Sequence, residues 1–324
     1  MTQVSHQSTK GWKASFRALL KQHKGISADG RKVVSYATQQ YRQDVLWQGL
    51  RDLRAMGFKF KHVGAFRGKH MARLVVHWEQ KGLSASTMQN RLSVFRLFAR
   101  WLGKDGLVLP LERYVKHPDA FKRAYSASVS RSWSDKGKDT QAILDAVRSE
   151  HKRFGDALAL QRWFGLRTKE SLLLKPHQND KGHVLVVTHG TKGGRDRYVP
   201  IEAVEQRALL ERIKDYVGYS ESLVPKHQSY VQCRNQYYYI LKKYGITRQN
   251  GITAHGLRHE HLNELYQRTT GHNAPVRGGQ LHRQDAALDH HGRACVAERA
   301  GHSRASIAAA YLGGKLHDDG ATHS

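Results

Sequence analysis

The sequence has 324 residues, of which 39% are hydrophobic, and it carries 54 Lys and Arg side chains against 27 Asp and Glu, for a net charge of +27. The length suggests about two domains, and the hydrophobic content excludes a globally disordered chain. No apolar run approaches the ~18 residues that cross a membrane, and two cysteines are too few for a disulfide framework.

The positive charge is spread along the chain. Residues 1–120 carry 22 basic and 7 acidic side chains, and residues 121–324 carry 32 and 20. This distribution favours a polyanionic partner, above all double-stranded DNA, over a membrane surface, an acidic protein or a merely soluble basic protein. The polar start of the chain (residues 1–10) predicts no secretory signal. We therefore expect a cytoplasmic, nucleoid-associated protein.

Apolar residues recur with a period near 3.6 in the first part of the chain, which predicts a helical bundle over residues 1–116 that binds DNA. The clearest stripe runs from Met88 to Leu102, and Ser86 with Gln89 has the pattern of a capping box at its start. The opposite face carries three arginines, for which a solvated surface is the alternative to contact with DNA phosphates. These arginines are Arg91, Arg96 and Arg100.

A polar segment, residues 117–136, is expected to be a linker, and residues 137–324 a second domain. Helices are predicted at 139–150 and 155–165, and strands at 184–187 and 198–201 with a glycine-rich turn between them. Helical patterns resume from residue 203, except at 270–292. The fold class expected is mainly α with a small β-hairpin (α+β).

Five short segments of the second half carry groups that suit phosphoryl transfer. Guanidinium groups grip two phosphate oxygens and stay charged, and Arg167 and Arg258 are the best candidates for this task. Glu170 follows Arg167 by three residues and could orient it through an ion pair. His255 shares a helical face with Arg258, and Lys192 lies in the predicted turn.

The final two segments contain His302 and Tyr311, nine positions apart. The order Arg167, Lys192, His255, Arg258, His302, Tyr311 resembles the catalytic domain of tyrosine recombinases, the phage integrase family. Residues 139–313 carry this resemblance, and the helical first half resembles the core-binding domain of the same family.

The resemblance implies a site-specific recombinase or integrase of a mobile genetic element. Tyr311 would form a 3′-phosphotyrosyl link, Lys192 would protonate the leaving 5′ oxygen, and His255 would take the tyrosine proton. His302 would bind the phosphate, and Arg195 beside Lys192 would contact DNA. The reaction would need no cofactor and no metal, and the two-domain clamp would act as a homotetramer on paired DNA sites.

One departure from the family is the long spacing between Arg258 and His302, 44 positions. We expect the surplus at 270–292 to be an inserted surface loop, with a metal site as the alternative. The residues that could hold the metal are His282, His290 and His291, and Asp285 and Asp289 alone are thin support for such a site.

Two other functions fit parts of the pattern: a type IB topoisomerase, and a non-catalytic DNA-binding protein on the same scaffold. The sequence does not specify the DNA target, the direction of the reaction, accessory factors or the oligomeric state without DNA.

Overall fold

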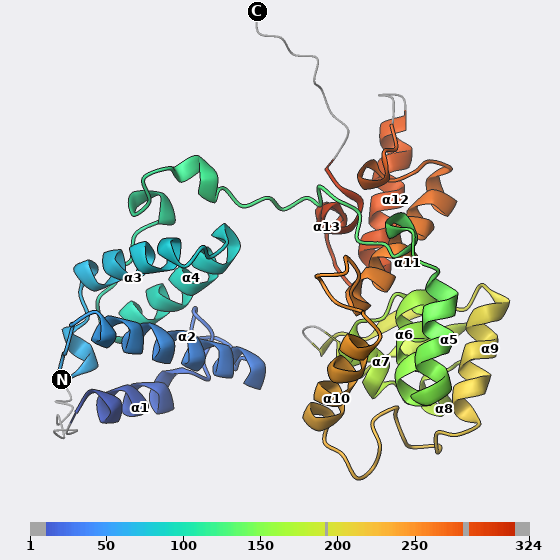
Figure 1. Cartoon of the computed structure of the whole chain (residues 1–324), viewed down its shortest axis with the longest axis horizontal. Coiled ribbons are helices and arrows are strands. Elements are labelled where there is room, and N and C mark those ends of the chain that lie inside the picture. The colour runs from blue at the N-terminus through green and yellow to red at the C-terminus, as the bar shows by residue number, and fades with distance from the viewer. Residues whose placement is uncertain (1–10, 192–193, 281–284, 315–324) are drawn as a thin grey trace, which may run out of the picture. The chain divides into compact units, whose positions relative to one another are not determined.

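The computed structural model describes residues 11–191, 194–280 and 285–314. The chain divides into unit 1, Met1–Arg123, and unit 2, Ala124–Ser324 (Figure 1). This boundary lies within the segment 117–136 that the sequence predicts to be a linker. Trp133 of that segment is nevertheless fully buried in unit 2, so its last residues are part of a core.

Unit 1 is a helical bundle whose apolar stripes meet in one core. Helix α4 starts two residues earlier than the predicted capping box, because the side chain of Ser84, not Ser86, accepts the Thr87 backbone N–H. Short 3-10 turns follow at Leu111–Arg113 and Pro118–Phe121. The α-helices of the described part are α1 Trp12–His23, α2 Tyr36–Ala55, α3 Gly68–Gln80 and α4 Ala85–Trp101.

The described part of unit 2 consists mainly of helices and contains one two-stranded antiparallel sheet. Strands β1 (Val184–Val187) and β2 (Arg197–Pro200) pair with Val184 opposite Pro200 and Val187 opposite Arg197. The mainly α fold with a small β-hairpin is therefore confirmed. The helices described in unit 2 are α5 Thr140–Glu150, α6 Lys152–Phe164, α7 Thr168–Leu173, α8 Pro176–Asn179, α9 Val204–Lys214, α10 Tyr230–Lys243, α11 Ala254–Thr270, α12 Ala286–Arg299 and α13 Ala309–Leu312.

Helix α11 lies at the centre of the site-bearing part of unit 2. Most of its residues are buried, and it packs against α6, α12 and α13 (Figure 1). A helix that is buried nearly all round can carry polar residues only if they have partners inside the protein. Its polar side chains, Arg258 among them, are therefore candidates for a functional cluster.

The prediction of a surface loop over 270–292 is wrong for its last part, because helix α12 begins at Ala286. Asp289 on this helix is buried, accepts a hydrogen bond from Tyr266 Oη at 2.7 Å and pairs with Arg293 at 2.8 Å. These partners explain why the polar-looking segment folds into the core: its charges are neutralised there. Residues 281–284, including His282, lie outside the described residues.

No helix in the described ranges combines the length and apolar character needed to cross a membrane.

Candidate active site

The site begins with a buried carboxylate, Glu170, at the start of helix α7. Helix α6 ends at Phe164 because Gly165 adopts a left-handed backbone (φ 59°), which glycine does without strain. Arg167 is the N-cap residue of α7, and Glu170 occupies the third helical position. Glu170 accepts the Arg167 backbone N–H at 2.7 Å and its Nη1 at 2.6 Å. The two residues thus pair across a helix start, not along one continuous helix.

Three guanidinium groups surround the Glu170 carboxylate. Besides Arg167, Nη2 of Arg197 lies 2.7 Å from Oε2, and Nη1 of Arg258 lies 3.9 Å from it. Burial disfavours the ionised carboxylate, but the charges of Arg197, Arg167 and Arg258 outweigh burial and hold its pKa below the usual range. Burial lowers the pKa of Arg197 only to about 10, so it stays charged at pH 7. One negative and three positive groups leave an excess of positive charge that suits an anion.

Arg167 and Arg258 are held by the same backbone oxygen. Each donates from Nη2 to the carbonyl of Ala300, at 2.7 Å in both cases. Arg258 is fully buried and also donates from Nη1 to the Gly165 carbonyl. These contacts fix two guanidinium groups side by side, which is the arrangement that two oxygens of one phosphate need.

Tyr311 on helix α13 reaches the same cluster. Its Oη accepts a hydrogen bond from Nε of Arg258 at 3.4 Å, and the guanidinium carbon lies 5.6 Å from the centre of its ring. The side chain is 7% exposed. The backbone carbonyl of Tyr311 accepts a bond from Asn263 of α11 at 3.3 Å, which ties α13 to that helix. The late tyrosine of the sequence motif therefore lies next to its second arginine.

Two histidines of α11, His255 and His259, face Tyr311. Their ring centres lie 6.2 and 4.9 Å from the centre of the tyrosine ring. The His255 side chain keeps an exposed part, yet desolvation, followed by the charges of Arg258 and Arg131, lowers its pKa to about 4. Desolvation, followed by His255 and Arg131, lowers the pKa of His259 to about 3. Both imidazoles are neutral at pH 7, so each has a nitrogen able to accept a proton.

His302 lies beside Arg167, and its Nε2 is 3.5 Å from Nη2 of the arginine. Both residues line a cavity of about 210 Å³, together with Thr191 and Arg195 from the two sides of the hairpin turn. Lys192, the predicted proton donor, lies outside the described residues. The cavity therefore joins the arginine cluster to the base of the segment that carries this lysine.

The three arginines predicted to contact DNA from unit 1 have partners within the protein. Arg96 donates to the carbonyl of Leu109 at 2.9 Å, and Arg100 donates to that of Ala28 at 2.7 Å. Arg91 lies over the ring of Trp78, 5.4 Å from its centre. Arg96 and Arg100 remain exposed, so both can still meet a phosphate, but they also hold loops of unit 1.

Sequence reasoning missed Arg197 and His259. Arg197 shares the buried face of β2 with Val199, and a charged side chain on the buried face of a strand requires a buried partner. The position of Arg197 on the buried face of β2 could therefore have indicated that it belongs to the site. His259 follows His255 by four residues, so it lies on the same helical face and could have been included on that ground.

Comparison with protein-family models gives two matches. The model "Integrase" matches residues 123–264, and the model "Phage integrase, N-terminal" matches residues 17–108. The first contains Arg167, Glu170, His255 and Arg258. The second covers most of the helical bundle of unit 1.

The curated relatives are tyrosine recombinases. XerA of Thermococcus kodakarensis is 26% identical over 196 residues, which make up 60% of this chain and 66% of the relative. XerC of Xanthomonas axonopodis pv. citri is 26% identical over 207 residues, 60% of this chain and 64% of the relative. The matched region thus spans slightly less than two thirds of the length of these two relatives.

Among solved structures, the Tn1549 transposon integrase in complex with transposon right end DNA has a TM-score of 0.56 at 15% identity, covering 91% of this chain and 93% of that one. A lambda integrase dimer bound to a COC′ core site has a TM-score of 0.59 at 16% identity, covering 93% and 79%. At these identities the likeness shows a shared fold.

Proposed function

The chain belongs to the phage integrase family of tyrosine recombinases, and we propose that it cleaves and rejoins DNA at specific sites through a 3′-phosphotyrosyl intermediate on Tyr311. The observation that carries this proposal is the position of the Tyr311 phenol beside Arg258, which shares the Ala300 carbonyl with Arg167. The proposed nucleophile and the two guanidinium groups that we propose bind phosphate lie within one cluster.

In the proposed reaction, Tyr311 Oη attacks the phosphorus of the scissile phosphate, and the bond from phosphorus to the 5′ oxygen breaks. Arg167 and Arg258 stabilise the charge that builds up on the two non-bridging oxygens, aided by His302. Glu170 and its partners hold these arginines in place before DNA arrives, so little reorganisation is needed during the reaction.

Two proton transfers complete the step. The Tyr311 proton passes to a neutral imidazole, for which His255 is the first choice because its lowered pKa keeps the ring unprotonated at pH 7 and its side chain is exposed. Lys192 supplies a proton to the departing 5′ oxygen. The 5′ hydroxyl of a partner strand then attacks the phosphotyrosyl bond, which restores the tyrosine and joins the strands.

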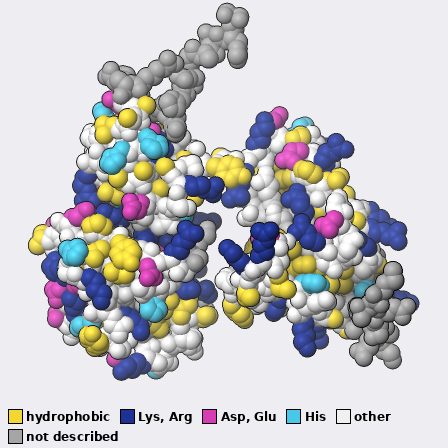
Figure 2. Space-filling model, turned by 180° about the vertical axis from the view of Figure 1, so that it is seen from behind, with side chains coloured by type: hydrophobic (Ala, Val, Ile, Leu, Met, Phe, Trp, Pro, Cys, Tyr) yellow, Lys and Arg dark blue, Asp and Glu magenta, His cyan; other side chains and the backbone are white. Residues whose placement is uncertain are grey.

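We further propose that both units bind double-stranded DNA, which is the substrate, and that Arg195, which follows the hairpin turn, is one of the contacts. Lys and Arg side chains are spread over the visible face of each unit (Figure 2). One similar structure is a lambda integrase tetramer bound to a Holliday junction, with a TM-score of 0.51. On this basis we propose a homotetramer on paired sites. The Tn1549 likeness favours integration or excision of a mobile element.

The test uses suicide DNA in which a nick lets the released 5′ fragment diffuse away, so that the covalent intermediate accumulates. Wild-type protein should give a protein–DNA adduct that withstands denaturation, and Tyr311→Phe should give none while binding the same DNA. DNA binding without any adduct would support a non-catalytic DNA-binding protein. Relaxation of supercoiled DNA of any sequence, without exchange between duplexes, would support a type IB topoisomerase.

A further inference from the structure

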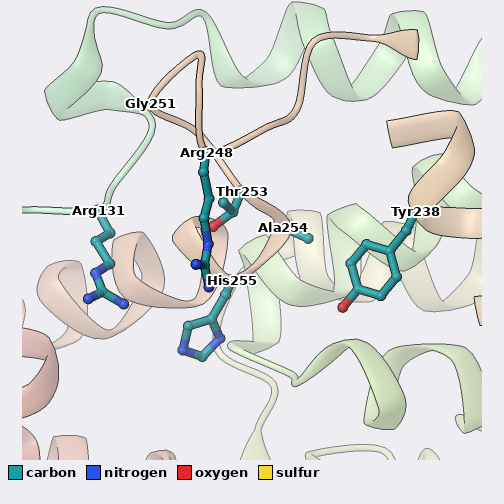
Figure 3. Close-up of a pocket in the computed structure, with 7 residues that line it drawn as sticks. All are labelled: Arg131, Tyr238, Arg248, Gly251, Thr253, Ala254 and His255. Atoms are coloured by element: carbon teal, nitrogen blue, oxygen red, sulfur yellow. The ribbon is translucent and has the colours of Figure 1, made fainter. Parts of the chain in front are cut away.

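A second basic pocket lies in unit 2, and His255 is one of the residues that line it. It encloses about 580 Å³ and is lined by Arg131, Arg248, Thr253 and His255, with Tyr238 at one end (Figure 3). No acid is found among the described residues that line it. The pocket is thus positively charged and open to solvent, and it shares one residue, His255, with the surroundings of Tyr311.

The side chains of the two pocket arginines extend in the same direction. In Figure 3 Arg131 and Arg248 both extend downward, toward the height at which the ring of His255 lies. Both side chains are exposed, and within the described ranges neither has a carboxylate within 4.0 Å. Two unpaired guanidinium groups on one pocket are able to bind the oxygens of a single phosphate.

Arg131 is held beside helix α11 by its neighbours. Nε1 of Trp133 donates to the carbonyl of Thr253 at 2.8 Å, and the backbone N–H of Trp133 donates to Glu260 at 2.9 Å. Gly256 permits this approach, because a Cβ there would lie 2.4 Å from the Arg131 carbonyl oxygen. The segment that carries Arg131 is therefore fastened to the start of α11, and the pocket has a fixed wall.

The start of helix α11 adds to the field of the pocket. Its 17 residues begin after Thr253, which caps the helix without a side-chain hydrogen bond to the backbone. Free N–H groups at a helix N-terminus carry partial positive charge and favour an anion. Arg131, Arg248 and the start of α11 therefore all favour a negatively charged group in the pocket.

We propose that this pocket holds a backbone phosphate of the cleaved DNA strand next to the phosphate that Tyr311 attacks, with Arg131 and Arg248 as its ligands. The proposal rests on the proposed function, because it needs DNA at the tyrosine. His255 lies between the two phosphates, with its ring centre 6.2 Å from that of Tyr311. A strand held at two successive phosphates cannot rotate about the first, so the pocket would align the scissile bond for attack.

The experiment combines a scan of the DNA with a double variant of the protein. Single phosphates around the cleavage site are replaced, one at a time, by uncharged methylphosphonates. Binding and adduct formation are measured for wild type, for R131A/R248A and for the control K181A/K226A, which removes two exposed cations that do not line the pocket. Ionic strength is kept constant, because phosphate contacts are salt-dependent.

We expect one methylphosphonate, adjacent to the scissile position, to weaken wild-type binding about tenfold. R131A/R248A should bind unmodified DNA more weakly by a similar factor. A methylphosphonate at that position should not weaken its binding further, whereas methylphosphonates at other positions should weaken it as they do wild type. The slope of its log affinity against log salt concentration should also be smaller than that of wild type, by the amount expected for the loss of about one phosphate contact or more. The control should remain sensitive at every position where wild type is.

Additive losses at every position in R131A/R248A would overturn the proposal. A variant with Arg131→Lys in place of Arg131→Ala separates the effect of lost charge from a structural change in the pocket. Lysine keeps the positive charge, so this variant should recover part of the DNA affinity. The adduct formed by wild type on unmodified suicide DNA tests the proposed function separately. If wild type forms the adduct but the double variant and the methylphosphonate have additive effects at every position, only the proposed phosphate site is refuted. If their effects are not additive at one position but no adduct forms, only the proposed cleavage reaction is refuted.

Discussion

Nε of Arg258 lies 3.4 Å from the phenol oxygen of Tyr311, and this contact joins residues 53 positions apart in the chain. The arginine is fully buried on helix α11, while the tyrosine lies on the short helix α13. A phenol beside a fixed guanidinium group is poised next to the place where a phosphate would bind. The described residues of the proposed site thus lie together in the structure without DNA, and each can be tested for its proposed task.

Replacing either phosphate-binding arginine should abolish cleavage. In Arg167→Ala, adduct formation should fall by at least ~10²-fold because charge on one phosphate oxygen is no longer stabilised. DNA affinity should change little, since many other cations of the chain would still be available to contact the DNA backbone. Arg258→Ala should act likewise. Gel-shift and adduct assays on the same DNA check both, and parallel loss of binding and cleavage would assign the two arginines a structural role.

Glu170→Gln should cost both stability and cleavage. The substitution keeps the shape of the side chain but leaves three guanidinium groups without their buried counter-charge. Removal of one partner of a buried ion pair destabilises by about 3–5 kcal/mol, which urea unfolding would measure. An unchanged free energy of unfolding would mean that Glu170 does not hold the cluster together.

The ionisation of Glu170 also gives stability a defined dependence on pH. Its pKa is lower in the folded protein than in the unfolded chain, so its contribution is present above the ordinary pKa of a glutamate and is lost as pH falls through the folded value. Wild type should therefore lose stability faster than Glu170→Gln as the pH is lowered below about 4.5. Parallel pH curves for the two proteins would contradict this.

Arg197 should behave differently from its neighbour Arg195. Arg197 is buried and binds Glu170, whereas Arg195 is exposed and lines the cavity. We expect Arg197→Ala to lower the free energy of unfolding by about 3 kcal/mol and to reduce adduct formation. Arg195→Ala should leave stability unchanged and weaken only DNA binding. Similar unfolding curves for the two variants would contradict a supporting role for Arg197.

The proposed base, His255, predicts an unusual pH profile. Its pKa of about 4 means that the imidazole stays unprotonated, and able to accept a proton, well below pH 6.5. With DNA well below saturation, the rate of adduct formation reports ionisations of the free protein, so it should stay level from pH 7 to about pH 5 and decline only as the pH nears 4. A decline centred near 6.5 would show a histidine with an ordinary pKa as the base, and His255→Gln should remove the acid limb if His255 is responsible.

The helices and the hairpin were predictable because their apolar periodicities are strong. The stripe from Met88 to Leu102 became α4 with an error of two residues at its start, since Ser84 and Ser86 are equally suitable as caps by sequence. The helix over 286–292 was not predictable from periodicity, because its buried face includes Asp289, which is neutralised by Arg293 and Tyr266 from tertiary contacts.

Sequence order selected several residues of the candidate site, but it did not predict the contacts that support them. Motif order selected Arg167, Arg258 and Tyr311, and the fold brings them to one cluster. Sequence spacing could not reveal that Arg197, from a strand, would share the Glu170 carboxylate, or that the Ala300 carbonyl would join two arginines. Those contacts depend on how α7, β2 and α12 pack, which no local pattern encodes.

The most direct test of the account is to identify the amino acid that carries the DNA in the trapped adduct. Protease digestion of the adduct formed on suicide DNA, followed by mass spectrometry of the nucleotide-bearing peptide, locates the bond. The account predicts a 3′ nucleotide linked through its phosphate to the oxygen of Tyr311 in every labelled peptide. Attachment at another residue, or a labelled peptide from Tyr311→Phe, would contradict it.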